Sequence, residues 1–331
     1  MLYYYALLYY NINLKQIKTM KKIHLISTLI GLLVFSTISK ADLKVVTSIK
    51  PIHSLASYIM DGVGSPGLIV DGYNSPHSFQ LKPSHAKMLE QADIIFWIGE
   101  DLENFLEKPL ATIAKKAEKI ELLEIKGIKK LKFRERNIFE EHEEHDDHGD
   151  DAKKKEHDDH EGHGHGEYDP HIWLNPINAK VILNEITEHL IENDFKNAST
   201  YKSNLAKALA KIDKLIIDVI TETNTDLSYV VFHDAYQYYE NRFNVNILGA
   251  MTVNPDVMPG AEQIHEIHEV IEHDNVSCIL SEPQFNPDII KSIAKDTSVK
   301  TGVLDPLGAN LKPGKDLYFD LIRNMSASFN C

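Results

Sequence analysis

The pattern of apolar and polar positions divides the chain after Ala41 into short apolar runs that alternate with segments of helical periodicity. Some runs, such as Ile94-Ile95-Phe96-Trp97-Ile98, are continuously apolar, which is typical of strands buried on both faces of a parallel sheet. Such repeated βα units predict an α/β fold. The predicted strands are 44–48, 67–70, 93–98, 119–123, 228–232, 246–248, 276–281 and 300–304, and the predicted helices between them are 52–60, 84–91, 102–116, 235–242, 261–273 and 287–295.

Two further predicted helices, 176–192 and 199–222, separate the two βα blocks. The second is long, and its apolar residues recur on one stripe. We therefore expect two βα lobes with mainly parallel sheets, joined by a long rigid connecting helix, with a site in the cleft between the lobes. The expected boundaries are 42–197 for the N-terminal lobe, 198–224 for the linker helix and 225–331 for the C-terminal lobe.

The N-terminal 41 residues read as an export signal that follows an upstream extension. Lys21 and Lys22 precede an apolar run over 23–38, and Ser39-Lys40-Ala41 places small residues at the positions that a signal peptidase reads. The run is short for a membrane anchor, which is the alternative. We expect translation to start at Met20, cleavage after Ala41, and a mature protein in the bacterial periplasm.

The two cysteines, Cys278 and Cys331, can form one bridge in an oxidising compartment or remain free thiols. A bridge would close a long loop and stabilise the protein by roughly 4 kcal/mol through the chain entropy of the unfolded state.

Charge is concentrated in one segment. The 331 residues have a net charge of −14, and 140–169 alone holds fourteen acidic residues and three lysines, a net of −11. The acidic balance argues against a nucleic-acid partner. Seven histidines occur in the same segment, which has no apolar period and predicts a mobile acidic loop over 134–169. These histidines are His142, His145, His148, His157, His160, His163 and His165.

Candidate metal ligands stand where predicted strands end. His233 follows the strand 228–232, Asp305 follows 300–304, and His77 lies in the loop after 67–70. His171 stands where the acidic loop returns to ordered structure. Ligands of open α/β sheets bind beyond the carboxyl ends of the strands, so these side chains can converge on one cleft. Three imidazoles and one oxygen donor form a natural tetrahedral Zn²⁺ set, whereas manganese and iron sites take more carboxylate.

Several motifs carry a family resemblance. They are Ser75-Pro76-His77-Ser78-Phe79-Gln80, Asp169-Pro170-His171-Ile172-Trp173, Phe232-His233-Asp234-Ala235-Tyr236, Ser281-Glu282-Pro283-Gln284-Phe285 and Asp305-Pro306-Leu307-Gly308. In this order, from about residue 43 to the end, the chain resembles the periplasmic zinc-binding proteins of bacterial zinc-uptake ABC transporters.

The resemblance implies a binding protein without catalysis, acting as a monomer, that holds zinc between two lobes and passes it to a membrane permease. It implies His77, His171 and His233 as ligands, and the histidine in the third position favours zinc over manganese. Some zinc members place a glutamate before the first histidine, but this chain has Pro76, so Asp305 or a water would fill the fourth position. The resemblance also implies a disulfide between Cys278 and Cys331.

Other functions remain open. A manganese or mixed-metal uptake protein is the nearest alternative. A zinc hydrolase would use Asp305 or Glu282 as a base beside a metal-bound water. An exported adhesive protein would merely buffer metal through its histidine tract. That tract is expected to capture zinc weakly through interchanging sites, because ordering a long loop costs conformational entropy.

Overall fold

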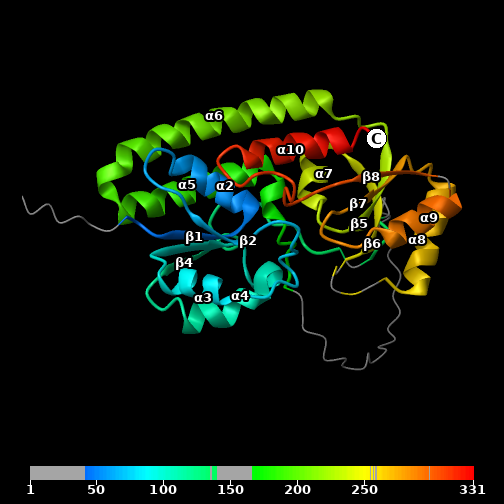
Figure 1. The fold of residues 1–331 in the computed structure, drawn as a ribbon. Coiled ribbons are helices and arrows are strands. Elements are labelled where there is room, and N and C mark those ends of the chain that lie inside the picture. Colours follow the sequence, from blue (N-terminus) through cyan, green and yellow to red (C-terminus); the bar gives the residue numbers. More distant parts are fainter. Residues whose placement is uncertain are drawn as a thin grey trace, which may run out of the picture. The chain divides into compact units, whose positions relative to one another are not determined.

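Two four-stranded sheets organise the chain (Figure 1). The computed structural model describes residues 42–134, 136–139, 166–253, 255, 257, 259–297 and 299–331. Residues from Leu43 onward form one compact unit. The predicted signal peptide and the histidines of the acidic segment lie outside the described residues.

The first sheet has the order β2-β1-β3-β4 and is parallel throughout. Its strands are β1 (Val45–Ile49), β2 (Gly67–Val70), β3 (Ile94–Trp97) and β4 (Glu118–Glu121). Every residue of β1 and β3 is buried. Helices cover both faces of these central strands, which explains why their runs are continuously apolar rather than alternating.

The second sheet repeats this topology in the order β6-β5-β7-β8, again with parallel strands. Its strands are β5 (Ser228–His233), β6 (Asn246–Thr252), β7 (Cys278–Ser281) and β8 (Lys300–Val303). In each sheet the chain crosses over the first strand of its block, which places a switch point between β1 and β3 and another between β5 and β7. Crevices at such points, beyond the carboxyl ends of the strands, are where α/β sheets bind ligands. The α/β prediction with two parallel sheets is therefore confirmed.

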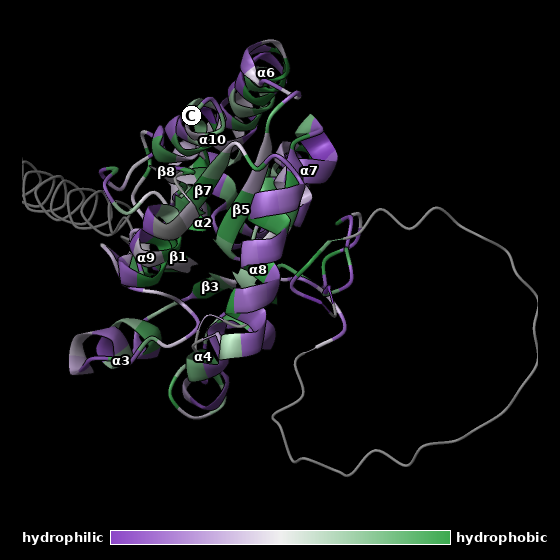
Figure 2. Ribbon diagram, turned by 90° about the vertical axis from the view of Figure 1, so that its right-hand side faces the viewer, coloured by the Kyte–Doolittle hydropathy of each residue, from purple (hydrophilic) through white to green (hydrophobic). Residues whose placement is uncertain are grey.

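Helices surround both sheets. In chain order they are α2 (Lys50–Ile59), α3 (Pro83–Glu90), α4 (Glu100–Thr112), α5 (Pro176–Asn193), α6 (Ala198–Glu222), α7 (Gln237–Phe243), α8 (Ala261–His273), α9 (Asp288–Thr297) and α10 (Leu317–Ser328), with short 3₁₀ turns η1 (Ile172–Leu174) and η2 (Phe195–Asn197). Figure 2 contrasts the largely hydrophilic surface of α8 with the hydrophobic strand β5 behind it. Within the described residues, none of the helices combines the length and the apolar character needed to cross a bilayer.

The long connecting helix α6 runs for 25 residues, or roughly 37 Å at 1.5 Å per residue. Its apolar stripe is buried against α2, α5 and α10. Asn204, which is buried on the same face of α6, donates through Nδ2 to the carbonyl groups of Ile59 and Asp61. These hydrogen bonds satisfy acceptors at the end of α2. The predicted linker helix is thus anchored along the first sheet's helices, beside α10 (Figure 1).

Helix α10 was not predicted from the sequence. It follows the second sheet in the chain but packs on α2 and α6, beside the first sheet. The backbone N–H of Tyr318 donates to Ser54 Oγ of α2 at 2.9 Å. The phenol hydroxyl of Tyr318 donates to the carbonyl of Trp173 at 2.8 Å. The chain therefore crosses between its two halves a second time, through α10 in addition to α6.

The chain on either side of the acidic segment pairs with itself, and the start of the segment pairs with the second sheet. Lys132 forms an antiparallel bridge with Tyr168, and Ile138 forms another with Gly249 at the edge of β6. Two backbone hydrogen bonds, from Phe139 N–H to the carbonyl of Leu248 and from Ala250 N–H to the carbonyl of Asn137, extend this second pairing. The residues at the start of the segment therefore form a short edge pairing on the second sheet.

Cys278 and Cys331 form a disulfide, which confirms the bridge and excludes two free thiols. Cys278 begins β7 at the centre of the second sheet, and Cys331 follows the end of α10. The bridge therefore ties the far end of α10 to the second sheet, while the body of α10 packs on the first half.

Replacing both cysteines with serine is expected to lower the free energy of unfolding by about 4 kcal/mol, because the unfolded chain regains the entropy of a long loop. Urea unfolding of the mature protein, with and without reductant, measures the change. The double variant itself serves as the control and should not respond to reductant. Equal stability of the oxidised protein and the double variant would contradict the prediction.

Candidate metal centre

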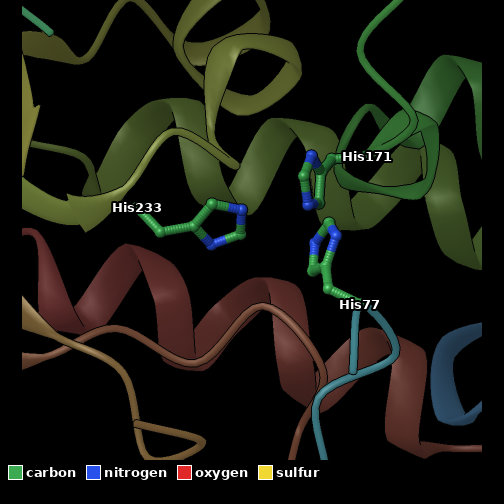
Figure 3. Close-up of side chains that lie close together, drawn as sticks. All are labelled: His77, His171 and His233. Carbon is green, nitrogen blue, oxygen red and sulfur yellow. The ribbon is translucent and has the colours of Figure 1, made fainter. Parts of the chain in front are cut away.

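Three histidines converge on one small cavity (Figure 3). His77 lies in the loop between β2 and α3, His171 immediately precedes η1, and His233 is the last residue of β5. Their ring centroids are 5.0 to 5.5 Å apart, and one nitrogen from each ring lies within 4.8 Å of the others. Two nitrogens bound to one tetrahedral Zn²⁺ lie roughly 3.4 Å apart, so closing the set needs motions of about an ångström.

The loop that carries His77 is shaped by local hydrogen bonds. Gly72 has a φ of 69°, a left-handed conformation that glycine adopts without strain. The amide of Asn74 donates to the carbonyl of Asp71, and His77 N–H donates to Ser75 Oγ at 3.3 Å. The turn brings the His77 ring toward His171 and His233.

Two buried carboxylates orient two of the imidazoles. Asp169 Oδ1 lies 2.7 Å from His171 Nδ1, and Glu282 Oε1 lies 3.0 Å from His233 Nδ1. An ionised carboxylate only accepts hydrogen bonds, so each Nδ1 carries the proton and the lone pair of Nε2 is available to a metal. His233 Nε2 is buried and has no hydrogen-bond partner among the described residues, which fits a position reserved for a cation.

The electrostatics of the site favour a bound cation. Burial raises the pKa of Asp169 to about 7. Burial, and then the nearby charge of His233, hold the pKa of His171 well below 6.5. Burial also opposes a charge on His233, but the charge and hydrogen bond of Glu282 outweigh it, so the pKa of His233 is raised. A bound dication would be balanced by two carboxylates, Asp169 and Glu282, leaving no net buried charge.

Further hydrogen bonds hold Asp169 itself. Gln237 Nε2 donates to its Oδ2 at 3.2 Å, and the hydroxyl of Tyr238 donates to its carbonyl at 2.8 Å. Both partners belong to α7 of the second half, whereas Asp169 and His171 lead into η1 and α5. The position of His171 is therefore set jointly by the two halves of the molecule.

Arg134, at the start of the acidic segment, is bound to acidic residues beside the site. Its guanidinium donates to Asp234 Oδ1 at 2.8 Å and to Glu240 Oε2 at 2.6 Å. Burial raises the pKa of Asp234 to about 6 and that of Glu240 to about 7, while Arg134 opposes both shifts. Asp234 directly follows His233, so this ion pair links the start of the acidic segment to the end of β5, the strand that carries His233.

Asp305, expected to be the fourth ligand unless a water serves, is not in the histidine group. Its carboxylate turns back onto its own loop and accepts the N–H groups of Leu307, Gly308 and Ala309, and it also accepts the amide of Gln284. The reason is local: the chain turns sharply after β8, and these otherwise unpaired N–H groups need an acceptor.

The cavity also contains residues that were not predicted as metal-site residues. Gln284 and Glu282 line it together with the histidines, beside the apolar side chains of Trp173, Phe285 and Leu307. The free space measures about 10 Å³, roughly the room for the centre of one water molecule. The sequence signal that could have identified Glu282 and Gln284 is the run Ser281-Glu282-Pro283-Gln284, which begins at the last residue of β7.

A second group with metal-ligand chemistry lies on the surface and consists of Glu118, His189 and Glu192. His189 Nδ1 lies 2.8 Å from Glu118 Oε1, and its Nε2 lies 3.2 Å from Glu185 Oε1. Carboxylates thus face both ring nitrogens, as is common for a surface histidine. Of the two groups, the one around His233 is the more buried, with His171 and His233 buried and His77 half-buried.

Known proteins are similar to this chain over most of its length. The family model described as "Zinc-uptake complex component A periplasmic" matches residues 45–330. The high-affinity zinc uptake system protein ZnuA of Brucella abortus (strain 2308) is 43% identical over 299 residues, covering 86% of this chain and 90% of that protein. The protein of the same name from Yersinia pestis is 36% identical over 303 residues, covering 90% and 94%.

The fold is also similar to that of a solved structure. A crystal structure of ZnuA superposes with a TM-score of 0.69 at 21% identity, covering 87% of this chain and all of that chain. At this identity the match concerns the fold alone. It agrees with two parallel sheets joined by a long helix.

Binding of Zn²⁺ is expected to release protons near pH 6, and to release fewer as the pH rises above the pKa values of His233 and Asp169. Below the raised pKa of His233 and the pKa of Asp169, the free protein holds protons that a dication must displace. Affinity should therefore fall as pH falls, by about tenfold per pH unit for each proton displaced. Calorimetry in buffers of different ionisation enthalpy counts the protons.

The matched variant is Asp169→Asn, which removes one of the titrating groups and keeps an oxygen for His171. It should release fewer protons than the wild-type protein near pH 6. A zinc affinity that is the same from pH 8 to pH 6 would contradict the electrostatic description.

Proposed function

The chain belongs to the family of periplasmic zinc-uptake components, and on that premise we propose that it captures one Zn²⁺ ion and delivers it to a membrane permease for import. The observation that carries the proposal is the meeting of His77, His171 and His233 around one buried cavity. Zinc is the cargo, and the three imidazoles are its proposed ligands.

Zinc is favoured over manganese by the donor set. The three groups that meet are imidazoles, which suit Zn²⁺, whereas Mn²⁺ sites use more carboxylate and carbonyl oxygen. The carboxylates nearest the cavity are engaged elsewhere: Asp169 and Glu282 with imidazole Nδ1 atoms, and Asp305 with backbone N–H groups. A manganese or mixed-metal protein would need at least one of them as a ligand.

A water fits the fourth position better than Asp305. Tetrahedral zinc with three histidines leaves one open position, and a water can fill it without breaking the hydrogen bonds that hold Asp305. A water at that position would also suit a hydrolase, but Glu282 and Asp305, the two carboxylates considered as its base, both have fixed partners. We therefore propose binding and delivery without catalysis.

Release follows from where the ligands originate. His77 extends from the first half and His233 from the end of β5 in the second, so separating the halves removes ligands from the ion. A permease that pulls the halves apart would thereby lower the affinity and take the ion. We propose that the mature protein begins after Ala41, works in the periplasm and acts as a monomer.

The histidine-rich segment has a separate role in this proposal. Its seven histidines, His142, His145, His148, His157, His160, His163 and His165, stand among acidic residues and supply many weak, exchanging sites for zinc. They would raise the local concentration of the ion near the cavity.

Replacing His77, His171 or His233 with alanine, one at a time, is expected to weaken zinc binding by more than about 100-fold, because each removes one of three protein ligands. Competition with a chelator measures the affinity of the mature protein without residues 140–165. His265→Ala, an exposed histidine on α8, is the matched control and should bind as the parent does. Wild-type affinity in any one of the three variants would refute that residue as a ligand.

Deleting residues 140–165 is expected to leave the tight site intact and to remove the weaker equivalents of bound zinc. The tight ligands come from ordered elements on either side of the segment, so they do not depend on it. Isothermal titration should show one strong equivalent in the deletion variant. Loss of that equivalent would place the tight site in the histidine-rich segment instead.

A further inference from the structure

Gln284 contacts the Asp305 carboxylate and lines the cavity of the three histidines. Its Nε2 donates to Asp305 Oδ1 at 2.9 Å, and the residue lines the cavity with His77, His171 and His233. Its Oε1 is buried and has no hydrogen-bond partner among the described residues. A buried amide oxygen without a partner costs free energy, so it indicates a donor that these residues do not supply.

The amide cannot be turned the other way. Both oxygens of Asp305 already accept backbone N–H groups, Oδ1 from Leu307 and Gly308 and Oδ2 from Ala309. The carboxylate therefore presents only acceptors, and the side chain of Gln284 must direct its nitrogen at it. The oxygen, the acceptor end, is then left for a donor.

The cavity supplies the place for such a donor. Its free space lies among the three imidazoles, which leave one position open on a tetrahedral zinc ion. A water on a metal ion is a strong hydrogen-bond donor, because the cation withdraws electron density from its oxygen. The apolar side chains of Trp173, Phe285 and Leu307 also line the cavity and offer such a water no hydrogen bond.

We propose that Gln284 is the positioning residue for the fourth zinc ligand: its Oε1 accepts a hydrogen bond from a zinc-bound water, and Asp305 acts through Gln284 by fixing its amide. The inference rests on the proposed zinc site and deepens it. The motif Ser281-Glu282-Pro283-Gln284 then serves the ion twice, since Glu282 orients His233 and Gln284 holds the water.

The arrangement has a consequence for selectivity. A neutral amide keeps the fourth position as water, so Asp169 and Glu282 alone balance the charge of a dication. A carboxylate bound directly at that position would replace a neutral water with an anionic ligand and add a third negative charge, and carboxylate ligands suit Mn²⁺ better. Gln284 thus keeps Asp305 from binding the ion directly, so that imidazole nitrogens remain the majority of the zinc ligands.

The test compares Gln284→Leu with Gln80→Leu, which removes an exposed amide from the neighbouring groove. In the mature protein without residues 140–165, Gln284→Leu should weaken zinc binding by about fivefold to tenfold, the effect of one lost hydrogen bond to a bound water. The visible spectrum of the Co²⁺-loaded protein should remain that of a four-coordinate site and shift in wavelength. Gln80→Leu should change neither the affinity nor the spectrum.

Asp305→Asn separates an indirect role from direct ligation. If Asp305 acts through Gln284, its replacement weakens binding no more than Gln284→Leu does, and the double variant binds as Gln284→Leu alone. A loss of more than about 100-fold in Asp305→Asn, as for removal of a histidine ligand, would show a direct ligand and overturn the inference. Unfolding by urea, measured in parallel, reports any loss of stability separately from zinc affinity.

The outcomes also separate this inference from the function on which it rests. If the parent protein binds no tight zinc, or binds it independently of the three histidines, the proposed function itself fails. If the parent binds zinc through the histidines but Gln284→Leu matches Gln80→Leu, only the role of Gln284 is refuted. A zinc-loaded crystal structure with a metal-bound water within hydrogen-bonding distance of Gln284 Oε1 would support it directly.

Discussion

The structure depends on two buried carboxylate–imidazole pairs, Asp169 with His171 and Glu282 with His233. Burying charge in this way is unfavourable unless opposite charge is close by, and Asp169 shows the cost in its raised pKa. Two carboxylates match the charge of one divalent cation. In the proposed zinc site the ion would supply the balancing charge, and the same two hydrogen bonds would orient two of its ligands.

Such a pocket requires that both halves of the molecule be held in register. Helices α6 and α10 each link the halves, and the disulfide ties the end of α10 to β7. Hydrogen bonds also join the first half to the loop after β8. Buried Lys50 donates to the carbonyls of Ala309 and Leu311, and Trp173 Nε1 donates to the carbonyl of Pro306. The loop that follows β8 is therefore fastened to the first half, which also fixes Asp305 and, through it, Gln284.

The strands could be predicted to within a few residues because short, continuously apolar runs such as 94–97 are typical of strands buried on both faces. The topology of two parallel sheets followed from the alternation of such runs with helices. Helix α10 was missed, although Leu317, Tyr318, Leu321, Ile322 and Met325 are spaced as a helix requires and are buried. No strand follows it, so the βα alternation that identified the other helices offered no cue at the end of the chain.

The sequence alone predicted the fold class and placed the three histidines among the candidate metal ligands, because strand ends and loop motifs are local and carry residue-specific chemistry. It left the disulfide open against two free thiols, and only the family resemblance implied the bridge. Only the tertiary structure decided which atoms those residues present. Asp305 faces its own loop, Gln284 contacts Asp305 and lines the cavity, and His171 depends on α7, through contacts between residues 21 and 68 positions apart. Side-chain orientation is set by competition for hydrogen bonds among groups distant in the chain, which no local pattern encodes.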